Sequence, residues 1–326
     1  MTRRVLRRCA AALWLLALAA VVTAAGCATA GRSVARPQLL APGVYMVPGS
    51  GGAPDEHNLG RIGNAGFIVG PDGVIAIDSG TSHAHGQALL AAIASVTDRP
   101  VRVLLLTHVR PEFVFGATAF RERGVPVHMQ ARSAGLMAAR CETCLKNLRQ
   151  VLGDAPLQGT ALVKPDHTFD STHELTLIGR PVRVLHFGVS SGPGDIAVLD
   201  VQSGVVFAGG LLDAGRVPDI QDSDLAGWKR ALAALAALTT RTVVPGHGPA
   251  LDSARAIAGV QDYLEQLERK VRALLDSGAS LLDVAEAAEL PSYQSWDQYD
   301  VIHRRNASIA YLRYEREALT KPEASK

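Results

Sequence analysis

The sequence predicts an α/β fold in which two mixed sheets pack face to face with helices outside. Short apolar runs of strand length, such as residues 101–106, alternate with longer segments of helical periodicity along most of the chain. Turn residues such as Pro71-Asp72-Gly73 separate neighbouring strands. With 326 residues, of which 48% are apolar, the chain can bury a substantial core as one domain.

The expected elements follow from these two periodicities. The N-terminal half predicts strands at 43–48, 64–70 and 73–78, a helix at 84–97, a strand at 101–107, a helix after Pro111, a strand at 125–129 and a helix from Ala131. The C-terminal half predicts strands between 174 and 208 and at 241–245, and helices at 224–238, 254–276, 280–289 and 300–318. No internal repeat interrupts this order, so we expect a single domain.

The N-terminus has the pattern of a targeting segment. Its first eight residues include four arginines, and the apolar stretch that follows is rich in alanine and leucine but short for a membrane-spanning helix. We therefore expect a signal peptide over 1–26. The small residues before Cys27 resemble a bacterial lipobox, which predicts lipidation of Cys27 and a tether over 27–42. Cleavage just downstream is the alternative and would give a soluble protein. In both cases the expected location is the periplasmic side of the bacterial cell envelope.

The charge of the chain excludes one class of partner. The formal net charge is +2, and four of the arginines lie in the leader. Without them, 29 basic residues stand against 31 acidic residues, a net charge of −2. This balance gives no reason to expect a nucleic-acid partner. We expect contact with the membrane only through the N-terminal lipid.

Two histidines lie where an α/β fold places its chemistry. The segment 107–116, Thr-His-Val-Arg-Pro-Glu-Phe-Val-Phe-Gly, follows the apolar strand 101–106 and brings His108 to the carboxyl end of that strand. Open α/β sheets place ligands and catalytic groups at these ends. His247 lies in a Pro-Gly-His-Gly segment after the strand predicted at 241–245.

Five landmarks, in this order, resemble the metallo-β-lactamase superfamily. They are the hairpin 64–80 ending in Asp-Ser-Gly, the loop 107–116, the segment Gly192-Pro193-Gly194-Asp195, the strand ending in Gly209-Gly210 and the Pro-Gly-His-Gly segment. The resemblance implies a four-layer αββα sandwich over 43–320, including a helical tail over 251–320. Trp296, His303 and Asn306 resemble the tail of exported members associated with sulfur-oxidation and quinoprotein-dehydrogenase systems. We expect His303 and Asn306 to fix the tail to the body.

The resemblance also implies seven positions at which the family holds its zinc ligands. They are occupied here by His108, Arg110, Glu112, Phe113, Ser191, Gly210 and His247. Five of the seven differ from the family pattern. The Arg110 guanidinium has no lone pair to donate and repels a dication, while Phe113 and Gly210 offer no donor atom. We therefore expect no zinc and no other cofactor, and we expect Arg110 to pair with Glu112.

These residues predict a pseudoenzyme with a degenerate zinc site that serves non-hydrolytic binding or scaffolding. Arg110 suggests a small anion, such as a carboxylate or a sulfur oxyanion, as the partner, and a periplasmic protein is the other candidate. The alternative is a divergent metal-dependent hydrolase in which His108, Glu112 and His247 hold a single zinc ion. A third interpretation is structural: both histidines are satisfied by backbone hydrogen bonds, and Asp78 accepts loop amides.

Cys141 and Cys144 form a second candidate site. An oxidising compartment would allow them to form a redox-active disulfide. The preceding residues 133–140 are predicted to be helical, and cysteines three apart in an unbroken helix lie too far apart for an unstrained bridge. A disulfide would therefore need a local break in the helix. Without the break, the pair is a local structural feature.

Overall fold

The computed structural model describes residues 36–320. The predictions for the signal peptide, for the lipidation of Cys27 and for the first part of the tether concern residues outside this range. Among the described residues, no helix is long and apolar enough to cross a membrane.

One sheet has seven strands, which lie side by side in chain order. They are β1 (Gln38–Ala41), β2 (Val44–Val47), β3 (Ala65–Gly70), β4 (Gly73–Ile77), β5 (Val101–Leu106), β6 (Val127–Gln130) and β7 (His167–Phe169). The strands from β1 to β4 pair antiparallel, and those from β4 to β7 pair parallel. All residues of β4 are buried, as expected for a strand covered on both faces.

The other sheet has six strands in the spatial order β13-β12-β11-β10-β9-β8. They are β8 (His173–Leu175), β9 (Val182–His186), β10 (Ile196–Asp200), β11 (Val205–Gly209), β12 (Thr242–Pro245) and β13 (Leu251–Asp252). Only β11 and β12 pair parallel here. Their carboxyl ends therefore meet at one edge of the sheet, and the loops that follow them carry site residues.

The α-helices of residues 36–320 lie between the strands and after the last of them. They are α2 (His83–Ala94), α3 (Pro111–Val114), α4 (Ala117–Glu122), α5 (Ala131–Leu152), α6 (Leu225–Ala236), α7 (Ser253–Asp276), α8 (Leu281–Ala287) and α9 (Arg304–Thr320). Short 3-10 turns lie at Ala155–Leu157 and Pro291–Tyr293, and a π-helical turn, Tyr299–His303, precedes α9. Ser82, Asp224 and Asp252 cap α2, α6 and α7 by accepting a backbone amide.

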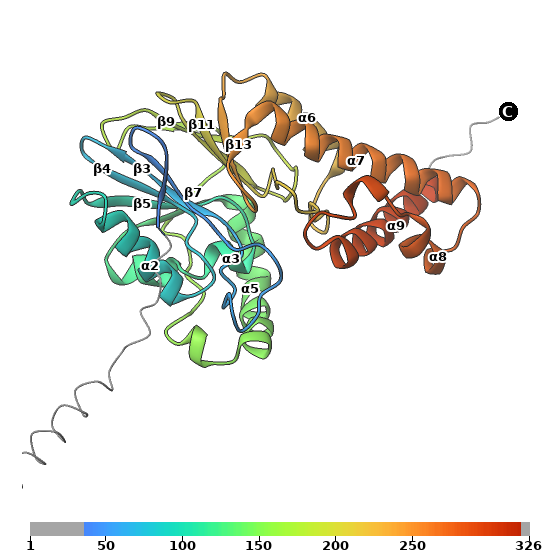
Figure 1. The fold of residues 1–326 in the computed structure, drawn as a ribbon, viewed down its shortest axis with the longest axis horizontal. Helices are drawn as coiled ribbons and strands as arrows, with labels where there is room; N and C mark the ends of the chain where they lie inside the picture. Colours follow the sequence, from blue (N-terminus) through green and yellow to red (C-terminus); the bar gives the residue numbers. More distant parts are fainter. Residues whose placement is uncertain (1–35, 321–326) are drawn as a thin grey trace, which may run out of the picture. The chain divides into compact units, whose positions relative to one another are not determined.

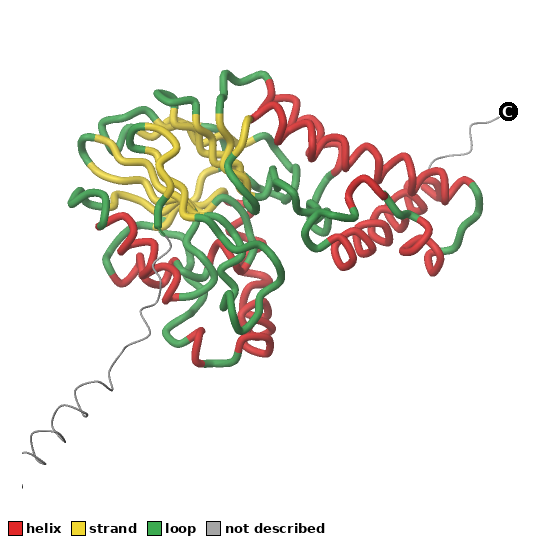
Figure 2. Tube along the Cα trace, viewed as in Figure 1, coloured by secondary structure: helices red, strands yellow, loops and turns green. Residues whose placement is uncertain are grey.

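The two sheets pack face to face, with helices over both outer faces (Figures 1 and 2). Ile75 and Leu105 of the first sheet and Val184 and Val198 of the second belong to the buried cluster between the sheets. A second cluster joins the first sheet to α2, α4 and α5, and a third joins the second sheet to α6 and α7. The predicted four-layer αββα architecture is confirmed.

The C-terminal helices α7, α8 and α9 pack on one another and form the predicted helical tail (Figure 1). The His303 ring contacts the Tyr263 hydroxyl at 3.1 Å and the Ala288 carbonyl oxygen at 2.9 Å. Asn306 donates to the Pro218 carbonyl and accepts the Ile220 amide. Asn306 thus fixes the tail to the loop after β11, as expected, whereas His303 binds only within the tail.

Two sequence predictions about local structure were wrong. The tether was expected to reach residue 42, but β1 starts at Gln38 and pairs antiparallel with β2. The strands of the middle region were expected from residue 174 onward, but β7 forms at His167–Phe169 as the last strand of the first sheet. Both strands are short, and pairing with a neighbouring strand stabilises them more than their own sequence pattern does.

The helix break that a disulfide between the two cysteines would require does not occur. Helix α5 continues without interruption through Cys141 and Cys144, and both carry free thiols. Cys141 is buried against the first sheet, and burial raises the pKa of its thiol to about 12. The pair does not line the pocket described below.

Candidate functional site

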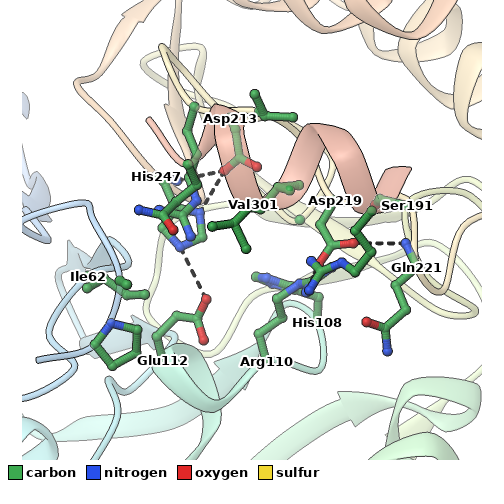
Figure 3. Close-up of a pocket in the computed structure, with 18 of the residues that line it drawn as sticks. Ile62, His108, Arg110, Glu112, Ser191, Asp213, Asp219, Gln221, His247 and Val301 are labelled. Carbon is green, nitrogen blue, oxygen red and sulfur yellow. Dashed lines mark hydrogen bonds and ion pairs between the residues drawn. The ribbon is translucent and has the colours of Figure 1, made fainter. Parts of the chain in front are cut away.

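A polar pocket lies at the carboxyl ends of β5, β11 and β12, closed on one side by the π-helical turn and the start of α9 (Figure 3). Its volume is about 260 Å³. Its charged or ionisable lining residues are His108, Arg110, Glu112, Asp195, Asp213, Arg216, Asp219, His247 and Arg305. Its apolar lining residues are Ala53, Pro54, Ile62, Val217, Val301 and Ile302. Six of the seven positions singled out by the sequence lie here; Phe113 does not line the pocket.

His108 is buried and is held by a chain of side-chain hydrogen bonds. Its Nδ1 lies 2.8 Å from Thr107 Oγ1, which in turn lies 2.8 Å from Asp78 Oδ2. Burial, aided by the positive charge of Arg110, lowers the pKa of His108 to about 3. The ring is therefore neutral at physiological pH. The prediction that backbone groups bond to the His108 ring was wrong, because its hydrogen-bond partner is the Thr107 hydroxyl.

Asp78 anchors this chain at the end of β4. Its backbone has a positive φ of 56°, and its Oδ1 accepts the Thr107 amide at 2.9 Å. The expectation that Asp78 accepts a loop amide is confirmed. Burial raises the pKa of this carboxyl to about 7, against the opposing effect of its hydrogen bonds with Thr107.

His247 lies between two carboxylates. Its Nδ1 is 2.8 Å from Asp213 Oδ1, and its Nε2 is 3.2 Å from Glu112 Oε1 (Figure 3). Burial alone would lower the pKa of His247, but Asp213 and Glu112 outweigh it and raise that pKa. Ionised carboxylates can only accept hydrogen bonds, so these two contacts favour the doubly protonated, positively charged imidazole. The expectation of backbone hydrogen bonds for this ring was also wrong.

Arg110 and Glu112 do not pair with each other, contrary to the prediction. Arg110 Nη1 donates to Asp219 Oδ2 at 2.7 Å, and Arg305 donates to the same oxygen at 2.6 Å. Glu112, in the single turn of α3, faces His247 instead. Burial alone would raise the pKa of Glu112, but His247 and then Arg110 lower it to about 2. Glu112 is therefore ionised throughout the physiological range.

Phe113 separates the two histidines beneath the pocket. Its ring is fully buried, with its centroid 4.2 Å from that of His108 and 5.3 Å from that of His247. Pro111 at the first position of α3 fixes the turn that directs this ring inward. An apolar ring therefore occupies the space between the imidazoles.

Ser191 and Gly210 both lie beside Asp195, and Gly210 also lies beside the ring of His108. Ser191 Oγ donates to Asp195 Oδ2 at 2.7 Å, while burial raises the pKa of Asp195 to about 6. A Cβ atom at Gly210 would lie 2.8 Å from both Asp195 Oδ2 and His108 Cδ2. Position 210 thus has no room for a side chain unless its neighbours move.

These residues do not fit a zinc ion as they are arranged. Within residues 36–320, no group of three or more His, Cys, Asp or Glu side chains converges as metal ligands. His247 has a carboxylate on each nitrogen, and the guanidinium of Arg110 lies in the pocket. A doubly protonated imidazole has no lone pair for a metal.

Three charged partners, Asp213, Asp219 and Arg305, were not predicted from the sequence. They are neither histidines nor residues at the family's ligand positions. One signal was available for Asp213, which follows Gly210 by three residues at the end of a strand. Asp219 and Arg305 carry no such signal, because the fold alone brings the loop after β11 and the tail to Arg110.

Comparisons with known proteins agree with this geometry at the level of the fold. The model of the Metallo-beta-lactamase superfamily matches residues 59–247. A curated relative, the linear primary-alkylsulfatase of Pseudomonas sp. (strain ATCC 19151), is 20% identical in an alignment of 269 positions that covers 70% of this chain. The aligned region is 50% of that relative, so this chain spans about half of its length.

Solved metallo-beta-lactamases share the architecture. The enzyme from Pontibacter korlensis is 23% identical, with a TM-score of 0.53 over 62% of this chain and 87% of its own. FIM-1 from Pseudomonas aeruginosa, in its mono-zinc form, is 21% identical, with a TM-score of 0.55 over 71% and 94%. The enzyme from Erythrobacter litoralis is 20% identical, with a TM-score of 0.56 over 71% and 96%. At these identities the likeness shows the fold alone.

Proposed function

The chain belongs to the metallo-beta-lactamase superfamily, and we propose that it binds a small anion in its pocket without zinc-dependent hydrolysis. The observation that carries the proposal is the environment of His247. Its two ring nitrogens donate to Asp213 and Glu112, which leaves no lone pair for a metal. The zinc site is therefore degenerate in this proposal, and the pocket serves binding or scaffolding.

The opposite side of the pocket supports an anionic ligand. Arg110 and Arg305 share one carboxylate oxygen of Asp219, so two guanidinium groups face a single negative charge. Burial alone would raise the pKa of Asp219, but Arg110 and Arg305 hold it below its usual value. The unshared N–H groups of a guanidinium suit a carboxylate or a sulfur oxyanion. The relative named as an alkylsulfatase makes a sulfur oxyanion a reasonable probe.

The test is a binding measurement on the purified protein. We expect acetate, propionate or sulfate to bind in isothermal titration, and Arg110→Met to weaken this binding about tenfold or more. Arg140→Met is a matched control, because Arg140 pairs with Asp222 outside the pocket lining. Hydrolysis of β-lactam, thioester, ester and alkyl sulfate substrates should not exceed that of a variant lacking both His108 and His247. Absence of any anion binding contradicts the proposal.

A second candidate function is a divergent hydrolase with one zinc held by His108, Glu112 and His247. It is favoured by a single observation, that all three residues line the same pocket. It requires His247 to release a proton and Glu112 to turn from the ring to the metal. Stoichiometric zinc that is lost on His108→Ala would establish it.

The proposed location is the periplasmic side of the cell envelope, with a lipid on Cys27. This proposal rests on the basic and apolar leader and on the small residues before Cys27. Cys27→Ser is expected to abolish labelling by a radioactive or clickable fatty acid. A wild-type mature N-terminus that starts after Cys27 with a free amine would contradict lipidation and give a soluble protein.

A further inference from the structure

A second cavity lies outside the pocket described above, where α6, α7 and α9 meet. Its volume is about 150 Å³, well above the ~10–15 Å³ that a single water molecule needs. Lys229 of α6, Glu268 and Arg272 of α7, and Arg313 and Tyr314 of α9 belong to its lining. None of these residues lines the pocket around His108, so the cavity is a separate candidate site.

Arg313 brings a positive charge that no carboxylate of the described chain neutralises. Its guanidinium donates to the Ser223 hydroxyl at 3.2 Å and to the carbonyl oxygens of Ile220 and Gln221, each at 3.0 Å. All three acceptors are neutral. These bonds use three of the five N–H donors of a guanidinium, so two donors remain for another acceptor.

Two carboxylates on this side of the cavity are already paired with cations. Glu268 accepts from Lys229 at 2.5 Å and from Arg272 at 3.1 Å. Glu317 accepts from Arg272 at 3.2 Å. Neither carboxylate forms an ion pair with Arg313.

Asp224 is the third carboxylate of the lining. Its Oδ2 lies 3.6 Å from Arg230, and its Oδ1 accepts the Ala226 amide at the start of α6. Each lining carboxylate thus has a cation beside it, and the positive charge of Arg313 is left over. The amino end of α6 adds a partial positive charge, because the first amides of a helix have no partners within it.

Tyr314 adds a hydroxyl that has no hydrogen-bond partner. The residue is 4% exposed, and its hydroxyl oxygen is buried without a donor or acceptor among residues 36–320. Arg272 covers the ring, with its guanidinium carbon 3.8 Å from the ring centroid. Burial, aided by the charge of Glu268, raises the pKa of the hydroxyl, so it stays protonated and can donate. A buried hydroxyl without a partner is unfavourable, which favours a ligand that accepts from it.

Hydrogen-bond donors without acceptors thus come to the cavity from two neighbouring residues of α9. Lys229 of α6 adds more, because an ammonium group has three N–H donors and Glu268 takes one of them. Donors on two helices around one small cavity suit a ligand with oxygens in several directions. We infer that the cavity binds a tetrahedral oxyanion, and the ligand that we expect is a phosphate group.

This inference is independent of the proposed function, because the two sites share no residue. The phosphate group can belong to the free ion or to a small ester. Titrations with inorganic phosphate and with glycerol 3-phosphate distinguish these sources, since the ester binds only if the cavity leaves room for its alcohol. Both titrations use the Arg110→Met variant, in which the other pocket has lost its central guanidinium.

In this background we expect one inorganic phosphate to bind per chain in isothermal titration. Arg313→Met should weaken the binding about tenfold or more, the size of a hydrogen bond to a charged group. Arg316→Met is the matched control, because Arg316 is exposed on the same helix and does not line the cavity. It should change the affinity by less than about twofold at physiological salt.

A pair of tyrosine variants keeps the test valid if Arg313→Met does not fold. Tyr314→Phe removes a hydroxyl that forms no hydrogen bond, so the midpoint of thermal unfolding without phosphate should stay unchanged or rise. Phosphate should bind this variant about three- to tenfold more weakly. Tyr311→Phe removes a hydroxyl that donates to the Ala279 carbonyl oxygen at 2.9 Å, so it should lower that midpoint and leave the phosphate affinity unchanged.

Three results would overturn the inference. The first is that no phosphate binds in the Arg110→Met background. The second is phosphate binding that neither Arg313→Met nor Tyr314→Phe weakens. The third is an equal loss in Arg316→Met, which would indicate a general effect of charge rather than a site. Failure of acetate, propionate or sulfate to bind the wild type would contradict only the proposed function.

Discussion

His108 and His247 each lie two residues beyond a strand, β5 and β12 of different sheets, and line the same pocket, yet their pKa values shift in opposite directions. His108 bonds to a threonine hydroxyl and has its pKa lowered to about 3, so it is neutral. His247 donates to two carboxylates and has its pKa raised. The ring of Phe113 packs against both of them.

The contacts of each ring nitrogen, rather than the surrounding motif, therefore decide what a histidine does. A neutral ring with a free nitrogen can accept a hydrogen bond or bind a metal. A ring with a carboxylate on each nitrogen can do neither.

The largest effect is expected from removing the charge of His247. His247→Gln leaves Glu112 and Asp213 buried without their cation and should lower the free energy of unfolding by about 3–5 kcal/mol. His108→Gln is the matched variant, because it replaces a neutral ring by a neutral amide, and it should cost about 1–2 kcal/mol. Urea unfolding at pH 6 measures both. Equal losses would show that the two rings do not differ in charge.

The second effect is a dependence of stability on pH. The raised pKa of His247 stabilises the fold fully below about pH 6.5, and this contribution is lost as the pH rises through the folded pKa. Glu112, with its pKa lowered to about 2, stabilises the fold above about pH 4.5. Asp78, with its pKa raised to about 7, binds more protons folded than unfolded, so it also destabilises the fold as the pH rises.

We therefore expect the free energy of unfolding to be highest near pH 4.5 and to fall above it, by roughly 2–4 kcal/mol between pH 6 and pH 8. Asp78→Asn removes one titrating group and should flatten this decline without abolishing it. The measurement is urea unfolding across that range. Stability that rises from pH 6 to pH 8 would contradict the signs assigned to both groups.

A smaller effect is expected at Gly210, which lies beside His108 and Asp195. Gly210→Ala forces a Cβ to within 2.8 Å of His108 and Asp195 and should lower the free energy of unfolding by about 1–3 kcal/mol. Gly135→Ala is the control, because a Cβ there meets no atom within 4 Å and the site is helical. Gly135→Ala should raise the free energy of unfolding by about 0.5–1 kcal/mol. The same crowding opposes attempts to rebuild a zinc site through Gly210→Asp.

The smallest effect is expected in α5, remote from both histidines. Cys144→Ser should change the free energy of unfolding by less than about 0.5 kcal/mol, because Cys144 is partly exposed and forms no disulfide. Thiol titration of the native protein should modify Cys144 before the buried Cys141. If oxidation joins the two, the bridge must distort α5 and should be easily reduced. A bridge that resists reduction would contradict this account.

The fold was predictable where local patterns are strong. The apolar run 101–106 became β5 with those bounds, and the helix predicted from Ala131 begins there. The short strands β1 and β7 were not predictable, because three or four residues carry no clear period and their pairing depends on distant partners.

The site was predictable as a set of positions but not as a set of contacts. Six of the seven positions line one pocket, because strand ends gather there in this class of fold. The partners were not predictable, since Arg110 and Asp219 are 109 residues apart and Glu112 and His247 are 135 apart. The pairing of Arg110 with its near neighbour Glu112, predicted from proximity in sequence, was wrong for this reason.

The most direct test of the account is the zinc content of the purified protein, prepared without chelator and dialysed against added zinc. The account predicts substoichiometric zinc, unchanged by His108→Gln and His247→Gln, because His247 has no lone pair to offer. One zinc per chain, lost in either variant, would contradict it and would identify the pocket as a mononuclear metal site.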